Sequence, residues 1–299
     1  PENKSLADFV ALILLDEIVD NLCMLKKEKF LFLTPEIAVI EKLCDNETVK
    51  EVLVCLPSDY NEETYERIFN NKPTGIKVTF NTNATLLTND IIKFFEGNDI
   101  TLFISFPCGN PSVCDTITNR NNSFEKIVTK LDLLKGSKVK YTTNIVVPSL
   151  NLPYVRDTVA FLKARYDIKN VSITRAAKPA NSDDTFDAYL LDREGLAQLQ
   201  NISVALCKEF NISVATSCPY APCSIVSQEV YNLFGEKNIC TAGKTTYAID
   251  VDGNVKACPR DSHMYGNIFK EDFENIWERV QEWRDDTFLP EKCKECNKL

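Results

Sequence analysis

The sequence is short of histidine and glycine, and these shortages exclude common kinds of active site. Its 299 residues include one histidine, His263, so any acid–base scheme built on histidine must run through that residue. Nine glycines are few for a nucleotide-binding enzyme, and no phosphate-cradling glycine loop, zincin motif or Ser-His-Asp arrangement occurs. We therefore expect His263 to be an exposed or capping residue of its loop.

The sequence also lacks a long uninterrupted apolar run and a cluster of basic residues. Near its start, FVALILL is followed at once by acidic residues, and no basic leader with a cleavage site precedes it. We expect residues 1–28 to be an N-terminal helical segment of a cytoplasmic protein that does not enter a membrane. The net charge of −9 disfavours nucleic acid as a partner.

Short β-rich runs alternate with amphipathic helical patterns along the chain. Six runs predict strands at 29–34, 49–56, 75–82, 99–106, 139–147 and 169–175. Between them come helix signals, among them Ser123 as the N-cap of SFEKIVTKLDLL. Such alternation is typical of parallel β/α units, and six units are too few for a closed eight-stranded barrel. The predicted fold class is α/β, with a partial (β/α)6 TIM-like barrel over residues 29–216 or, alternatively, an open sheet.

The working face of such a fold lies at the carboxyl ends of its strands. Polar residues at these ends are candidates for a substrate pocket: Asn81, Asn83, Ser105, Asn144 and Arg175. Cys55, Cys108 and Cys114 also lie at or beyond strand ends, either as buried thiols or as ligands of an atypical cluster. The acidic stretch 183–194 follows the sixth strand and is either solvated or a contact for a basic peptide.

Six of the twelve cysteines lie after residue 215, in a stretch, 217–299, that we expect to be a small separate domain. Between Cys240 and Cys258, TTYAIDVDGNVKA alternates around Asp-Gly, which predicts a β-hairpin that brings the two thiols together. A helix with Phe273, Ile276, Trp277 and Val280 on one face then leads to Cys293 and Cys296. Four thiolates suit zinc or an iron–sulfur cluster.

This cysteine-rich pattern resembles the SPASM or twitch auxiliary-cluster domain of radical S-adenosylmethionine (radical SAM) peptide-modifying enzymes. The resemblance is carried by C…DGNVKAC, GNI…F..IW and CxxC. It implies one auxiliary [4Fe–4S] cluster, with zinc as the alternative, held by Cys240, Cys258, Cys293 and Cys296. Cys218 or Cys223 could substitute for one ligand.

Residues 29 to 180 also resemble the radical SAM barrel. NTNATLLT stands at the family's TNG strand end, and DTITNRNNSFEKIVTKLDLL is similar to its D…R…gSF helix entry. The family's CxxxCxxC loop is absent, because FLFLTPEIAVIEKLC runs directly from strand to helix. Its GGEP motif is replaced by CLPSDYN. Three cysteines on one loop leave an iron open for S-adenosylmethionine, so we do not expect this chain to cleave that cosubstrate.

The resemblance implies a role in peptide or protein maturation, and the missing motifs favour a degenerate member of the family without catalysis. Such a protein would bind a peptide or protein substrate, or pair with a catalytic radical SAM enzyme. Two alternatives stay open. One is an active peptide-modifying enzyme whose core cluster is atypical or lies on a missing segment, and the other is a zinc-stabilised interaction module.

Overall fold

The structure is a computed structural model, and its described residues form two compact units. The described residues are 30–32, 51–55, 77–97, 100–178, 184–235, 240–244, 247–249, 254–267, 270–271, 273–285, 287 and 289–295. The first unit takes in the chain up to Asn81, with Lys93–Ile100 and Thr241–Glu291. The second takes in Thr82–Ile92, Thr101–Cys240 and the residues from Lys292 on. The predicted helix in 1–28 lies outside the described residues, and the predicted boundary near 216 stays a prediction.

In the first unit, parallel strands are extended by a hairpin from the C-terminal part of the chain. β1 (Phe30–Phe32), β2 (Glu51–Cys55) and β3 (Lys77–Thr82) are parallel neighbours. On its other edge β1 pairs in parallel with β8 (Ala248–Ile249). β9 (Asn254–Lys256) and β10 (Gly266–Asn267) continue the sheet in antiparallel fashion. The pairing of β8 with β9 confirms the predicted hairpin, whose turn lies outside the described residues.

Apolar side chains from the hairpin and the helix that follows it are buried in the first unit. α10 (Phe273–Arg279) and α11 (Gln281–Arg284) come directly after β10. Ile276 and Val280 are fully buried, as their spacing on one helix face predicts. The ring of Trp277 meets Tyr247 edge to face at 5.9 Å between centroids. These contacts hold α10 on the hairpin.

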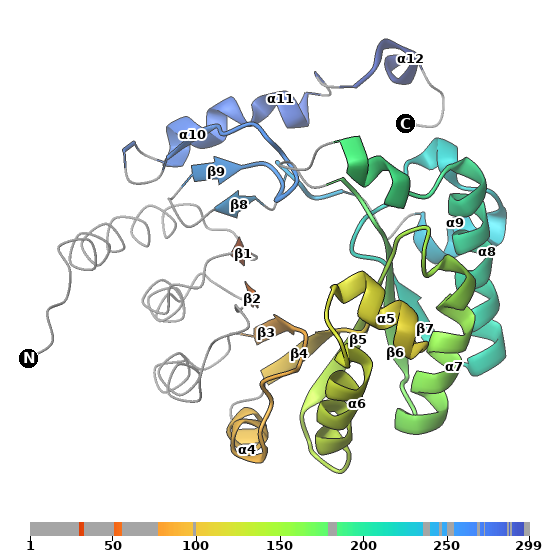
Figure 1. The fold of residues 1–299 in the computed structure, drawn as a ribbon. Coiled ribbons are helices and arrows are strands. Elements are labelled where there is room, and N and C mark those ends of the chain that lie inside the picture. Colours follow the sequence, from red (N-terminus) through yellow and green to blue (C-terminus); the bar gives the residue numbers. More distant parts are fainter. Residues whose placement is uncertain are drawn as a thin grey trace, which may run out of the picture. The chain divides into compact units, whose positions relative to one another are not determined.

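The second unit contains four parallel strands with helices packed beside them. β4 (Ile100–Ser105), β5 (Lys140–Val147), β6 (Asn170–Arg175) and β7 (Ser213–Ala215) pair in sequence order. The helical elements of this unit are α5 (Pro111–Thr118), α6 (Ser123–Leu134), η1 (Leu152–Tyr154), α7 (Val155–Tyr166), η2 (Asp184–Tyr189), α8 (Arg193–Phe210), η3 (Pro222–Ser224) and α9 (Gln228–Phe234), while α4 (Asn89–Gly97) and α12 (Glu291–Lys294) each contain residues of both units. α7, α8 and α9 lie side by side (Figure 1). All six predicted barrel strands are present in the structure.

The start of α6 corrects one prediction. Ser123 is not the N-cap. The N-cap is Asn122, which has a φ of 60° and whose side chain makes no capping hydrogen bond. The carboxylate of Asp115, within the preceding helix α5, accepts from the backbone N–H of Asn122 at 2.7 Å and of Ser123 at 2.8 Å. These N–H groups lack acceptors within the helix, and the negatively charged carboxylate takes the place of a side-chain cap. Local pattern cannot reveal an acceptor that comes from another helix.

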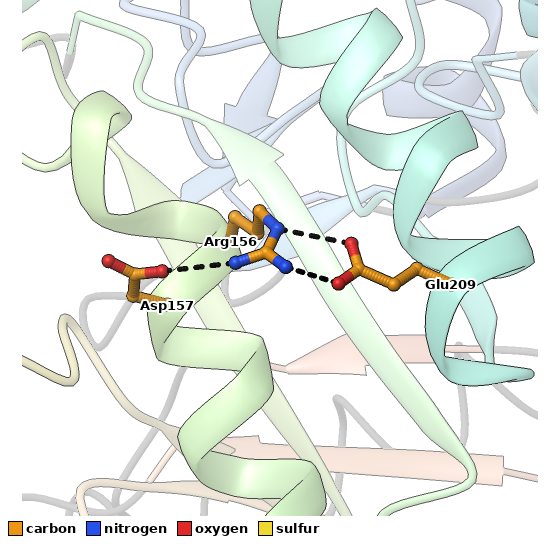
Figure 2. Close-up of polar contacts among 3 residues, drawn as sticks. All are labelled: Arg156, Asp157 and Glu209. Carbon is orange, nitrogen blue, oxygen red and sulfur yellow. Dashed lines mark hydrogen bonds and ion pairs between the residues drawn. The ribbon is translucent and has the colours of Figure 1, made fainter.

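An ion pair joins α7 to α8. The Arg156 guanidinium donates from Nε to Glu209 at 3.1 Å and from a second nitrogen to the other oxygen of that carboxylate, while Asp157 accepts at 3.4 Å (Figure 2). The hydrogen bonds to Glu209 raise the pKa of Arg156. Because both side chains reach solvent, water and salt screen the pair, so it orients the helices more than it stabilises them.

Candidate functional site

A cavity of about 630 Å³ opens at the carboxyl ends of β4, β5 and β6 in the second unit. Residues of three strand ends, of α5 and of η2 line it. None of the lining residues is charged, and most are apolar. The cavity lies where a parallel α/β fold places its functional groups.

Ser105 and Asn144, two of the five predicted pocket residues, meet in this cavity. They are opposite each other in the parallel register of β4 and β5. Asn144 is 8% exposed, and its Oδ1 accepts a hydrogen bond from the Thr174 hydroxyl at 3.3 Å. The Ser217 N–H donates to that hydroxyl oxygen at 3.0 Å, which leaves the hydroxyl hydrogen for Asn144. Among the described residues the amide nitrogen of Asn144 has no acceptor. It is therefore available to donate a hydrogen bond to a molecule in the cavity.

The other three predicted pocket residues do not line this cavity. Asn83 is exposed and accepts from the Thr85 N–H at 3.0 Å, which makes it a turn residue. Asn81 is the last residue of β3 but one, and it belongs to the first unit. Arg175 ends β6. Burial raises the pKa of Tyr220 to about 12, and the positive charge of Arg175 acts in the opposite direction on that pKa.

Sequence reasoning missed the apolar wall of the cavity. Phe186 and Tyr189 of η2 line it, with ring centroids 5.9 Å apart. η2 is held in place because Ser149 donates from its N–H to Tyr189 O at 2.9 Å. Lys178 forms ion pairs with Asp184 and with the next aspartate of η2, at 2.8 and 3.1 Å. Phe186 and Tyr189 are two aromatic residues in an otherwise acidic stretch of sequence, and this pattern is the signal that could have indicated the apolar wall.

The turn after β3 has a conformation that normally requires glycine. Ala84 has a φ of 64° and is fully buried. Its N–H donates to the Thr82 hydroxyl at 3.0 Å, which closes the turn. Because the resemblance aligns NTNA with the family's TNG, this chain keeps the glycine backbone with an alanine side chain.

Cys108 and Cys114 are buried thiols. Both side chains are fully inaccessible, and the Thr158 hydroxyl donates to the Cys108 sulfur at 3.8 Å. Burial raises the pKa of Cys114 to about 11, so the thiolate that a metal needs is disfavoured at neutral pH. The side chain of Cys55 lies outside the described residues.

The cysteines of the C-terminal region are more accessible. Cys240 is exposed, and Cys258, just after β9, and Cys293, in α12, are half-buried. Cys296 lies outside the described residues. The thiols of Cys240 and Cys293 are in no disulfide, and sulfur donors of this kind fit an iron–sulfur cluster or zinc. Cys240 and Cys293 belong to the second unit and Cys258 to the first, so the ligand set stays a prediction.

Two further observations bear on this region. In the described part of the chain, no group of three or more His, Cys, Asp or Glu side chains is close enough to hold a metal ion. Gly243, three residues after Cys240, has a φ of 66°, and a Cβ there would lie 2.6 Å from the Cβ of Trp283. Close packing against Trp283 therefore leaves no room for a side chain at position 243. Of the two substitute ligands, Cys218 is buried and Cys223 exposed, and His263 is exposed as expected.

Comparisons with known proteins fit this arrangement. Residues 240–297 match the SPASM family, an iron–sulfur cluster-binding domain. The chain is 27% identical over 216 residues to mycofactocin maturase MftC of Mycolicibacterium smegmatis, across 70% of this chain and 53% of that protein. It is 24% identical over 241 residues to the cysteine-type anaerobic sulfatase-maturating enzyme of Clostridium novyi, across 77% of this chain and 63% of that enzyme. The chain thus spans just over half to under two thirds of the length of these relatives.

A solved structure extends the comparison to the fold. Native anSMEcpe with bound AdoMet and Cp18Cys peptide superposes with a TM-score of 0.67 at 17% identity, over 90% of this chain and 86% of that one. The fold is therefore that of a radical SAM partial barrel. The chain is thus similar to radical SAM maturases in sequence and fold, and its residues 240–297 match the SPASM iron–sulfur cluster-binding domain. Both resemblances predicted from the sequence are confirmed.

No helix within the described residues has the length and apolar character needed to cross a bilayer.

Proposed function

We propose that this chain is a non-catalytic member of the radical SAM/SPASM group that takes part in peptide or protein maturation. It binds a peptide or protein substrate, or a partner maturase, and does not cleave S-adenosylmethionine. One [4Fe–4S] cluster is held by Cys240, Cys258, Cys293 and Cys296. When bound, the cluster supplies a structural centre and an electron-transfer site.

The link between β1 and β2 is the observation that carries this proposal. The two strands are parallel neighbours, with Phe30 opposite Val52, and the resemblance expects the family's cluster loop in the sequence between them. That segment contains one cysteine, Cys44, where the resemblance calls for three. β2 then ends at Cys55 and continues as LPSD, where the resemblance calls for GGEP. Both losses lie inside the chain, between strands that are present.

The maturation role is supported by the relatives. Both curated relatives are named as maturating enzymes, and the solved structure contains a peptide as well as AdoMet. An active enzyme with an atypical core cluster is the second candidate, because those relatives are enzymes.

Anaerobic reconstitution with iron and sulfide tests both candidates. We expect about four iron and four sulfide ions per chain and no 5′-deoxyadenosine after incubation with S-adenosylmethionine and reductant. Production of 5′-deoxyadenosine above a protein-free blank would reject the non-catalytic function. One equivalent of zinc in a colourless anaerobic sample would reject the cluster.

A variant pair tests the ligands. The double variant Cys293→Ala, Cys296→Ala should lose the iron and the visible absorption of the cluster. Cys207→Ala, a half-buried cysteine of α8 in neither ligand set, is the matched control and should keep both. Equal iron content in all three proteins would contradict the assignment.

A further inference from the structure

We infer that the uncharged cavity at the ends of β4, β5 and β6 binds a large apolar side chain of a peptide whose neighbouring residues are basic. The inference rests on the proposed function, in which the chain binds a peptide without using S-adenosylmethionine. It assigns the cavity to the peptide rather than to the cosubstrate.

The lining of the cavity argues against a charged occupant. With no charged lining residue, a buried ammonium, carboxylate or sulfonium would lose its water without gaining a counter-charge. An aromatic or long aliphatic side chain loses nothing by the same transfer and gains from burial. The volume of about 630 Å³ lies inside the range of small-molecule sites and admits such a side chain with adjoining backbone.

The rim of the cavity is apolar and open to solvent. Val146, Leu150 and Tyr189 line the cavity, yet they are 42%, 39% and 51% exposed. Large apolar side chains gathered at the mouth of an apolar cavity mark a contact surface for another molecule. A peptide that inserts one side chain would cover all three.

Asn144 and Ser105 provide a side-chain amide and a hydroxyl group to the cavity wall. Within the described residues the amide nitrogen of Asn144 has no acceptor, and the Ser105 hydroxyl has no hydrogen-bond partner. A peptide carbonyl beside the inserted side chain would accept from the Asn144 amide, at a position set by the bond from Thr174. The backbone of the peptide is thereby oriented at the cavity mouth.

The segment that forms the apolar wall is acidic. Asp184 and Asp187 share the single positive charge of Lys178, and the side chain of Asp184 is fully exposed even so. Asp192 and Glu194 follow on the same segment, against Arg193. With a net charge of −9 on the whole chain, basic residues flanking the inserted side chain fit this surface.

Binding of a short peptide series tests the inference. The probe is a fluorescein-labelled, C-amidated heptapeptide with a central tryptophan between two pairs of lysines, measured by fluorescence anisotropy with the full chain. We expect saturable binding that weakens at least tenfold when serine replaces the tryptophan, and at least threefold when glutamates replace the lysines. Equal affinity for the tryptophan and serine peptides, or no binding of the tryptophan peptide, would overturn the inference.

Variants locate the binding on the protein. Tyr189→Asp and Leu150→Asp change exposed rim positions and should each weaken binding at least fivefold. Val226→Asp changes an apolar residue that is 46% exposed and does not line the cavity, so it should bind as the unaltered protein does. Thermal unfolding checks that all three remain folded. If the rim and control variants bind equally well, the peptide does not use this cavity.

Competition separates the inference from the proposed function. Neither adenosine nor S-adenosylmethionine should displace the tryptophan peptide, and displacement by either would assign the cavity to the cosubstrate and overturn the inference. Formation of 5′-deoxyadenosine rejects the proposed function by itself. A peptide that binds without preference for an apolar centre, in a protein that forms no 5′-deoxyadenosine, rejects the inference alone.

Discussion

Ser105 at the end of β4 lies directly opposite Asn144 of β5, and both residues line the same cavity. The parallel register produces this pairing, because neighbouring parallel strands bring their carboxyl ends to one edge. The backbone extends the relationship, since the N–H of Phe106 donates to the carbonyl of Asn144 at 2.9 Å. Two residues far apart in the sequence thus form one polar point in an apolar cavity.

The Asp115 carboxylate should contribute to stability as the cap of α6. Asp115→Ala removes the acceptor for the N–H groups of Asn122 and Ser123, and we expect it to cost about 1–2 kcal/mol. Urea unfolding monitored by far-UV circular dichroism measures the loss. Asp157→Ala, which removes an exposed carboxylate of α7, is the control and should change stability little. Equal effects of the two substitutions would show that Asp115 is not a cap.

Ala84 should accept glycine at little cost. Ala84→Gly relieves a positive φ, worth about 1–2 kcal/mol, which offsets the lost methyl group and the greater freedom of the unfolded chain. We expect its free energy of unfolding to stay within about 1 kcal/mol of the original. Ala160→Gly, inside α7, has no such relief and should lose about 1 kcal/mol. Ala84→Val should be worse than either, because a β-branched side chain is poorly accommodated at positive φ.

The buried thiol of Cys114 should make stability fall at alkaline pH. Burial raises its pKa from 9.0 to about 11 in the folded protein, so the unfolded chain loses this proton first. The contribution of Cys114 is therefore complete below pH 9 and declines as the pH rises toward 11. Urea unfolding at pH 8 and pH 10.5 should show a smaller loss for Cys114→Ala than for the unaltered protein. An identical loss in both proteins would contradict the assignment.

Thiol labelling should separate the cysteines by exposure. In the native protein at pH 8, iodoacetamide should modify the exposed Cys223 well before the buried Cys108 and Cys114. Mass spectrometry of peptides after a time course gives the three rates. Rapid labelling of Cys114 without unfolding would mean that α5 opens readily.

Removal of iron should expose the C-terminal thiols and lower the melting temperature. If the proposed cluster binds the folded state, chelation under reducing conditions removes that binding free energy and lets Cys240 and Cys293 react. Differential scanning fluorimetry and labelling follow both effects. The double variant Cys293→Ala, Cys296→Ala is the control, and its melting temperature should not respond to the chelator. A response equal to that of the unaltered protein would place the metal elsewhere.

Sequence patterns predicted the strands closely because these strands are buried. The run predicted at 169–175 is β6, Asn170–Arg175, in which Val171 and Ile173 are fully buried. Val171, Ile173 and Thr174 are β-branched, and residues of this type are enriched in strands. The cap of α6 and the wall formed by η2 were not predictable, because each depends on a contact between separate elements. Asp115 reaches α6 from another helix, and Tyr189 is positioned by Ser149.

The candidate site was predicted in part for a related reason. Ser105 ends β4, and the parallel register places Asn144, which lies inside β5, opposite it. Asn83 also stands beyond a strand end, but its side chain closes a local turn, a role that competes with ligand binding in short polar residues. The cysteine ligands depend on the family resemblance, since spacing by itself leaves zinc and iron–sulfur equally open.

The pairing of β1 with β8 has a consequence for how the protein is made. Leu31 lies opposite Ala248, so β1 leaves the ribosome long before its partner strand β8 is synthesised. Until then the outer edge of β1 is an unpaired template, open to strands of other nascent chains. A helper that shields this edge during synthesis would raise the yield of folded protein.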